Sequence, residues 1–414
     1  MWLPVEIALT HLRNRKRQTL VSVLGVAMGV GFFIAMAALM QGFHVYFISK
    51  VIDVWPHVTI KDEYRNAPPQ PVQRLFGNGV VTLHGLKPRE ELRGIKDADT
   101  VLAELNRRSD LAAAPTLRGQ VFLRYGSKDV SATLVGIEIE YERRVSQLEK
   151  DLIAGSLNAL HTAANGIILG DGVAKKIGAE LNDTLSVISP AGVILKMKVV
   201  GIFRTGITPI DNFESYALLK KAQILQDRPN VINQIRIRLN DVNQARSIAS
   251  SIEARLDYRT ESWEETYENI LGIFVIQNGI MYSTVGAILI VAAFGIFNII
   301  STVIHEKTRD IGILKSIGFE ERDIRRIFLI EGLLVGLIGT LLGWALGYGL
   351  TRLLGTIRFH IEGFVTAQGF ILYYSITHYL IAGGFAILSA AFAAWLPARK
   401  AAHLNPVDII RGAA

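Results

Sequence analysis

The chain has 414 residues, of which 50% are hydrophobic and 20% charged, and its net charge is +7. Residues 51–269 hold 28 basic and 28 acidic residues, whereas the rest of the chain holds 16 and 9. The one large polar segment is therefore neutral, and the surplus cations flank apolar runs. This excludes a nucleic-acid-binding protein that works through a broad basic surface, and it is typical of a membrane protein with one soluble domain.

Residues 1–17 predict an amphipathic helix on the cytoplasmic side of a membrane. Apolar Val5, Ala8, Leu9 and Leu12 recur at helical spacing beside a cluster of basic residues. Two interpretations stay open: an anchor that lies in the membrane interface, and a helix that grips a partner subunit.

Four apolar runs are long enough to cross a bilayer, which takes about 20 residues. We expect spans at residues 18–49, 269–304, 327–351 and 373–398. The first run is too long for a secretory signal, whose apolar core has about 7 to 15 residues. A helix of 36 residues, the length of the second run, reaches about 54 Å against a hydrocarbon core of about 30 Å. Spans one and two are therefore predicted to continue beyond the membrane as a stalk.

Basic residues in the flanks predict the orientation of these spans. Lys and Arg are frequent before the first span, in the loop 305–326 and in the tail 399–414, but only two occur in the loop 352–372. Under the positive-inside rule, both termini and the loop 305–326 are expected in the cytoplasm and residues 50–268 outside. Because the chain has no cysteine, this outer domain contains no disulfide.

The outer domain is predicted to mix helices and strands. Alternating apolar residues indicate two hairpins, one joining Gln120–Tyr125 to Val130–Val135 and one joining Leu185–Ser189 to Val193–Ile202. The predicted fold class is therefore an integral membrane protein with four transmembrane α-helices and a large α+β extracytoplasmic domain between helices one and two.

A strand-helix unit is indicated twice in this domain. The strand Ile232–Leu239 is followed by a helix that Asp241 opens, and His57–Ile60 followed by a helix Glu90–Asn106 looks like a first copy. We therefore predict a split subdomain made of residues 50–110 and 231–268. A hairpin-rich subdomain of residues 111–230 is inserted into it.

Glycines recur on one face of span three, and two more lie in span one. In lipid, small residues let helix backbones approach closely. Packing within one chain and packing between subunits both remain open. The predicted helix-packing residues are Gly25, Gly29, Gly332, Gly336, Gly339, Gly343 and Gly347.

Two polar residues accompany the spans. Glu331 lies five residues after Arg326, and we expect its carboxylate to reach the headgroup region. His378 lies in the fourth apolar run and has no predicted role.

The sequence contains no motif for catalysis. It lacks the G-x-x-x-x-G-K-[ST] phosphate loop, H-E-x-x-H and G-x-S-x-G, and without cysteine it has no thiol nucleophile. We expect that the chain is not an enzyme and binds no metal or cofactor itself. Energy for transport would then come from a partner or an ion.

The loop between spans two and three is the predicted docking site for such a partner. It begins with charged residues and becomes amphipathic, with Ile311, Leu314 and Ile317 on one side, a pattern that suits a groove. A solvated connector is the alternative interpretation. The residues assigned to ATPase coupling are Glu306, Lys307, Arg309, Asp310, Ile311, Gly312, Leu314 and Lys315.

Several segments together resemble the permeases of the lipoprotein-releasing transporter, LolC and LolE, and their superfamily, which includes MacB and FtsX. The order and spacing of these segments carry the resemblance over nearly the whole chain. They are Met40–Phe43, the segment Ile168–Pro190, His305–Gly318, Ile324–Leu333, the glycine ladder, and Leu396–Ala401 with Asn405–Val407.

The resemblance implies a type VII ABC transporter permease in the bacterial inner membrane. Two permease chains, identical or different, would form the membrane dimer. Two copies of a separate cytoplasmic ATPase would bind ATP and Mg²⁺. The segment Glu306–Gly318 would be the coupling helix on that ATPase, whose closure would move helices one and two so that the outer domains eject cargo.

The resemblance also implies a cargo, namely a lipid-anchored molecule such as a lipoprotein taken from the outer leaflet. A tripartite efflux permease like MacB and a regulator of a periplasmic hydrolase like FtsX are the alternatives. LolC permeases recruit a periplasmic carrier through a projecting hairpin, but only Pro190–Gly192 join the strands here, so this chain would be LolE-like, homodimeric or a relative that moves something else. The residues expected to contact acyl chains are Ile34, Leu39, Phe43, Phe47, Phe274 and Met281.

Overall fold

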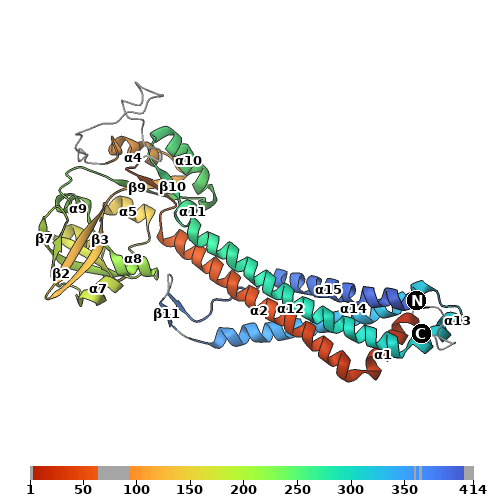
Figure 1. Ribbon diagram of the computed structural model, residues 1–414. Helices are drawn as coiled ribbons and strands as arrows, with labels where there is room; N and C mark the ends of the chain where they lie inside the picture. The colour runs from red at the N-terminus through yellow and green to blue at the C-terminus, as the bar shows by residue number, and fades with distance from the viewer. Residues whose placement is uncertain (1–2, 64–93, 359, 363–365, 405–414) are drawn as a thin grey trace, which may run out of the picture. The chain divides into compact units, whose positions relative to one another are not determined.

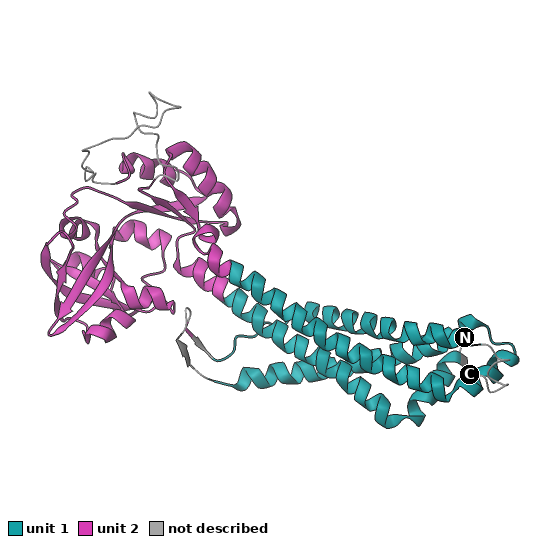
Figure 2. Cartoon of the chain, viewed as in Figure 1, with its two compact units in different colours: residues 1–46, 272–359, 368–414 teal, residues 47–271, 360–367 magenta. Residues whose placement is uncertain are grey.

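The computed structural model describes residues 3–63, 94–358, 360–362 and 366–404 (Figure 1). The chain divides into two compact units (Figure 2). The helical unit comprises residues 1–46, 272–359 and 368–414, and the mixed unit comprises residues 47–271 and 360–367. Two predicted features, the start of the helix at Glu90–Arg93 and the segment Asn405–Val407, lie outside the described residues.

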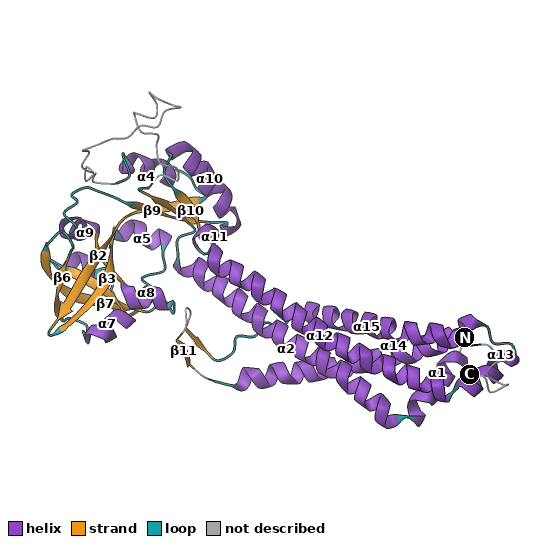
Figure 3. Ribbon diagram, in the orientation of Figure 1, coloured by secondary structure: helices purple, strands orange, loops and turns teal. Residues whose placement is uncertain are grey.

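Long helices dominate the helical unit (Figure 3). The four longest are apolar enough to cross a membrane, which confirms the predicted fold class. They are α2 (Lys16–Val54), α12 (Glu268–Glu306), α14 (Glu321–Thr356) and α15 (Ile376–Ala402). At 39 residues each, α2 and α12 run unbroken for about 58 Å, longer than a hydrocarbon core. Their extension beyond the membrane as a stalk remains a prediction.

Capping groups set where the last two long helices begin. Glu320 accepts a hydrogen bond from the amide of Asp323, whose side chain accepts one from the Glu320 amide, so α14 starts six residues before the expected span. The Ser375 hydroxyl accepts from the amide of Thr377, and α15 therefore starts at Ile376.

Two shorter helices complete the helical unit. The predicted N-terminal helix is present as α1 (Leu3–Asn14), and α13 (Thr308–Ser316) lies between α12 and α14. In α1, Ala8 and Leu12 are buried against the long helices whereas Val5 and Leu9 are exposed. The apolar stripe of α1 is therefore divided between packing within the chain and an exposed face.

The mixed unit is built on one sheet of ten strands. The order is β10-β1-β9-β2-β3-β8-β5-β7-β4, with β6 paired to β2 and β7. The strands are β1 (Val58–Lys61), β2 (Leu111–Tyr125), β3 (Lys128–Ile137), β4 (Leu152–Gly155), β5 (Gly166–Gly170), β6 (Thr184–Ile188), β7 (Ile194–Phe203), β8 (Glu214–Leu218), β9 (Gln234–Leu239) and β10 (Thr260–Ser262).

Short helices pack on this sheet and connect its strands. They are α4 (Ala98–Asn106), α5 (Ile139–Val145), α6 (Ala159–Thr162), α7 (Asp171–Ile177), α8 (Thr208–Phe213), α9 (Leu219–Leu225), the 3₁₀ turn η1 (Val242–Gln244), α10 (Ala245–Leu256) and α11 (Trp263–Thr266). A separate pair, β11 (His360–Glu362) and β12 (Thr366–Gln368), follows α14.

Both predicted hairpins are present. Strands β2 and β3 pair antiparallel from Thr116 with Ile137 to Tyr125 with Lys128, and β6 pairs antiparallel with β7. The strand β2 is longer than expected, because its first half pairs with β9 from Leu111 to Thr116. One strand therefore runs through both halves of the sheet.

The two predicted strand-helix units lie side by side. Strands β1 and β9 pair antiparallel, and Asp241 caps the turn before α10 by accepting from the amide of Asn243. The expected helix at Glu90–Asn106 is wrong in its first half as far as it is described, since α4 starts only at Ala98. Ile95 instead donates to the carbonyl of Ile232, and Asp97 has a φ of 49°, a left-handed conformation that ends a helix.

Candidate functional site

The segment between α12 and α14 is folded back against the helical unit. Ile311 of α13 is buried in the same apolar cluster as Phe328 of α14, and Leu314 packs against that cluster. The Lys315 ammonium donates to the carbonyls of Ala402 and Leu404, at 2.6 and 2.8 Å. These contacts hold α13 at the end of α15.

This packing involves part of the predicted coupling surface. Ile311 and Gly312 are buried, Leu314 packs on the apolar cluster, and the Lys315 ammonium is held by two carbonyl groups, so these four residues contact their own chain. The reason is that the apolar side of α13 completes the chain's own core.

The exposed side of α13 has a different composition. Ile313 and Ile317 are 52% and 70% exposed, although apolar. Arg309 and Asp310 are exposed beside them, and the Asp310 carboxylate accepts from Lys307 at 2.7 Å. Glu306, at the end of α12, forms an ion pair with Arg15. The outward surface of α13 is therefore a small apolar patch bordered by charges.

The glycines of α14 divide between two neighbouring helices. A Cβ atom built at Gly332 or Gly336 would lie 2.3 or 2.6 Å from the Cβ atoms of Ala394 and Ala390 on α15. Real Cβ contacts are rarely closer than 3.4 Å. The backbones of α14 and α15 therefore approach more closely than any side chain at these positions would allow.

The glycines in the C-terminal half of α14 face α2 instead. A Cβ atom at Gly339, Gly343 or Gly347 would lie 2.7, 2.6 or 2.9 Å from the Cβ atoms of Val26, Val30 and Ile34. In α2 itself, Gly29 faces α12 with the nearest atoms at 3.3 Å, and Gly25 has no neighbour within 4 Å among the described residues. Six of the seven predicted packing glycines thus contact another helix of the same chain.

The residues expected to contact acyl chains do not form one cavity. Ile34, Phe47, Phe274 and Met281 are buried within the chain. Phe43 is 40% exposed, and its ring meets that of Phe274 edge-on at 5.9 Å. Ile34 is unavailable because it fills the space left by Gly347. Of these six residues, only half-buried Leu39 and exposed Phe43 keep accessible surface on α2.

Apolar pockets occur elsewhere in the helical unit. One of about 150 Å³ lies between α2, α12 and α15, beside Phe33, Tyr282 and Phe385. A larger groove of about 630 Å³ lies between α12 and α15, and its walls include Phe294 and Phe392. Neither pocket is lined by any of the six residues expected to contact acyl chains.

Glu331 and His378 each lie beside a polar side chain of another helix. Glu331 is 1% exposed, and its carboxylate lies 3.4 Å from Nδ1 of His11 on α1. The expectation that this carboxylate reaches the headgroups is wrong, because α1 folds over it. The ring of His378 pairs with the side chain of Gln41 on α2.

The mixed unit contains a buried ionic network. Arg236 of β9 forms an ion pair with Glu142 of α5, which is 1% exposed. Glu214 of β8 accepts from Arg118 of β2 at 2.7 Å and from the hydroxyl of Tyr216 at 3.0 Å. Burial raises the pKa of Tyr216 well above its ordinary value, so the phenol remains protonated and donates to Glu214.

This network lines a cavity of about 520 Å³ and ties strands from both halves of the sheet together. Nearby, the rings of Trp55 and Tyr267 lie 4.7 Å apart. No group of three His, Cys, Asp or Glu residues within the described part of the chain is arranged to hold a metal ion. The ion pairs of the network join α5 to β9 and β2 to β8 within the mixed unit.

Two family models match the chain. Residues 19–255 match the MacB-like periplasmic core domain, and residues 282–406 match the FtsX-like permease C-terminal model. The first match covers more than half of the chain, and the segment between the two matches contains β10, α11 and the start of α12.

Known proteins are similar along the same ranges. The lipoprotein-releasing system transmembrane protein LolC of Xylella fastidiosa is 26% identical, over 99% of this chain and 98% of its own length. The macrolide export ATP-binding/permease protein MacB of a Shewanella species is 24% identical over 98% of this chain, which spans 60% of that protein. The solved extracellular domain of the transporter YknZ aligns with 49% of this chain and all of that domain, at 14% identity and a TM-score of 0.33.

Proposed function

This chain is an ABC transporter permease of the family that joins a MacB-like periplasmic core domain to an FtsX-like C-terminal region, and we propose that it extracts or releases a lipid-anchored cargo. The cargo, such as a lipoprotein, would leave the outer leaflet of the inner membrane at the expense of ATP hydrolysed by a partner. The observation that carries this proposal is the similarity to LolC, which extends over nearly the full length of both chains.

The partner ATPase would dock on the exposed side of α13. Ile313 and Ile317 supply apolar contact area, and Arg309 and Asp310 supply charges at its border. Two ATPase copies, which hold the ATP and Mg²⁺, would serve two permease chains, identical or different. Because α2 and α12 are unbroken over 39 residues, a movement imposed near α13 would travel along rigid backbone.

Co-purification tests this proposal most directly. The tagged chain is extracted from native membrane, and the retained proteins and acylated species are identified by mass spectrometry. An ATPase together with an acylated protein is the expected result. An ATPase with a cell-wall hydrolase or an efflux adaptor, and no acylated cargo, would refute the cargo but retain the permease.

Substitutions on α13 test the docking surface. Ile313→Ser and Ile317→Ser remove exposed apolar area, and we expect each to reduce the recovered ATPase several-fold, since each large apolar contact contributes about 1 to 2 kcal/mol. Lys400→Ser on α15 is the control, as this exposed residue is outside α13. Equal recovery from all three variants would move the docking site elsewhere.

Single cysteines test the proposed orientation, in which both termini and α13 are cytoplasmic. The chain has no cysteine of its own, so one introduced thiol reports alone. We expect a membrane-impermeant maleimide to label Ser127→Cys, in the β2–β3 turn, on intact spheroplasts. Ser316→Cys should react only after permeabilisation, and the reverse pattern would invert the topology.

A second candidate function follows from the relatives. The MacB relative and the match to the MacB-like core domain favour an efflux permease that works with an adaptor. The short β6–β7 connection, in which Gly192 donates to the carbonyl of Ser189, offers little surface for a periplasmic carrier. An adaptor in place of acylated cargo in the co-purification would select this candidate.

A further inference from the structure

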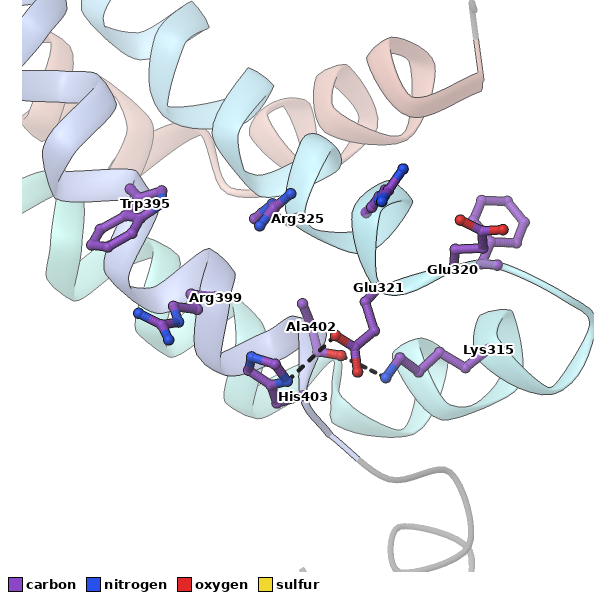
Figure 4. Close-up of a pocket in the computed structure, with 10 residues that line it drawn as sticks. Lys315, Glu320, Glu321, Arg325, Trp395, Arg399, Ala402 and His403 are labelled. Carbon is purple, nitrogen blue, oxygen red and sulfur yellow. Dashed lines mark hydrogen bonds and ion pairs between the residues drawn. The ribbon is translucent and has the colours of Figure 1, made fainter.

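A cationic pocket lies where α13 and α15 end and α14 begins (Figure 4). Its volume is about 840 Å³. Lys315 from α13, Arg322 and Arg325 from α14, and Arg399 from α15 contribute the positive charges. The pocket lies entirely within the helical unit, so its geometry depends on one compact body.

The acidic residues of this pocket are already engaged. The Glu320 side chain accepts from the first turn of α14 as its cap, and the Glu321 carboxylate lies 3.4 Å from Nδ1 of His403. The Lys315 ammonium is held by the carbonyl groups of Ala402 and Leu404 at the end of α15. Both carboxylates of the pocket therefore already have partners, and the positive charges of the pocket outnumber its negative charges.

The three arginines carry that surplus. Within residues 94–358 and 366–404, no carboxylate lies within 4 Å of Arg322, Arg325 or Arg399. The Arg399 guanidinium lies over the ring of Trp395 at 5.7 Å. Arg326, one position from Arg325, differs because Asp323 pairs with it at 3.7 Å. Among the described residues, the three guanidinium groups of the pocket therefore have no carboxylate partner.

The pocket continues into apolar surface along α15. The ring of Trp395 stacks with that of Phe392 at 6.4 Å. Phe392 belongs to the groove of about 630 Å³ between α12 and α15, together with Phe385 and Leu388. Positions 385, 388, 392, 395 and 399 follow helical steps of three and four, so one stripe of α15 passes from apolar, through aromatic, to cationic.

We propose that this stripe binds an anionic phospholipid, with its phosphate at Arg322, Arg325 and Arg399 and its acyl chains along the α12–α15 groove. Guanidinium groups match the geometry of phosphate oxygens, and basic pockets between transmembrane helices suit anionic headgroups. Tryptophan is enriched where membrane meets water, which places Trp395 at the level of the headgroup. A soluble phosphate compound would use the same arginines but leave the groove unfilled, so the groove favours a lipid.

Lipid retention by the full chain tests the proposal. The chain is reconstituted in phosphatidylcholine nanodiscs with an increasing fraction of phosphatidylglycerol, and the phosphatidylglycerol retained on the released protein is counted by native mass spectrometry. Each arginine near a membrane surface contributes about fivefold in binding, so the triple variant Arg322→Gln, Arg325→Gln, Arg399→Gln should bind about a hundredfold more weakly. Arg326→Gln is the matched control, being exposed on the same helix but outside the pocket.

A variant with lysine in place of all three arginines shows whether weaker binding by the glutamine variant comes from lost charge or from misfolding. The lysine variant keeps the three positive charges and loses only the bidentate contacts that guanidinium groups make with a phosphate. Its affinity for phosphatidylglycerol should therefore stay within about tenfold of that of the unchanged chain. Equal retention of phosphatidylcholine and phosphatidylglycerol would overturn the proposal, as would full retention by the glutamine variant. Displacement of phosphatidylglycerol by millimolar inorganic phosphate would assign the site to a soluble phosphate group. Loss of the ATPase from the glutamine variant with lipid binding unchanged would assign it to a protein partner.

Discussion

Replacing Gly336 by alanine should separate α14 from α15. The added methyl group would lie 2.6 Å from the Cβ atom of Ala390, whereas ordinary contacts begin near 3.4 Å. The two helices must therefore move apart by nearly 1 Å, which forfeits contacts along the seam and costs about 1 to 3 kcal/mol. The higher helix propensity of alanine returns up to about 1 kcal/mol. We expect a net loss of about 1 to 2 kcal/mol in the free energy of unfolding.

Exchanging the two residues should restore the packing. In the double variant Gly336→Ala, Ala390→Gly, the new methyl group occupies the space of the old one, because the next nearest atoms to it are 3.9 Å away. Its stability should return to within about 1 kcal/mol of the unchanged chain. Unfolding in mixed micelles by a denaturing detergent measures all variants, and Gly349→Ala is the control because no described atom lies within 4 Å of its added methyl group. If Gly336→Ala is as stable as this control, close packing of α14 on α15 is refuted.

Two further predictions concern the mixed unit. Glu142→Gln leaves the guanidinium of Arg236 buried without its main partner and should destabilise the chain by about 3 kcal/mol, whereas replacing both residues by methionine should cost less; chemical denaturation compares them. Burial alone would raise the pKa of Asp171, but hydrogen bonds from Lys175 and Arg204 outweigh it and lower that pKa. A carboxyl group whose pKa is lowered by folding stabilises the fold at pH values above 3.8, its pKa in the unfolded chain. This contribution is lost as the pH falls through the pKa in the folded chain. Asp171→Asn should therefore lose about 0.5 to 1 kcal/mol at neutral pH and nothing in strong acid, where thermal unfolding of the two chains should coincide.

Features with a strong periodic signal were predictable from the residues alone. The four long helices follow from apolar runs, because a bilayer requires about 20 apolar residues in sequence. Both hairpins follow from alternation around short turns that contain glycine, Gly126 in the β2–β3 connection and Gly192 in the β6–β7 connection. The first half of β2 was missed, since its alanines and Pro115 are typical of neither a strand nor a helix. Only its pairing with β9 makes that segment a strand.

Which side of an element faces its neighbours was decided by tertiary structure. The spacing of Ile311 and Leu314 showed that α13 has an apolar side, but an apolar side serves a core and a partner equally well. Folding assigned it to the core and left Ile313 and Ile317 exposed. The cationic pocket has the same origin, because Arg399 lies more than 70 positions after Arg322 and Arg325 in the sequence. A linear pattern determines what each helix can bury or expose, and the choice is made only when other helices compete for the same surface.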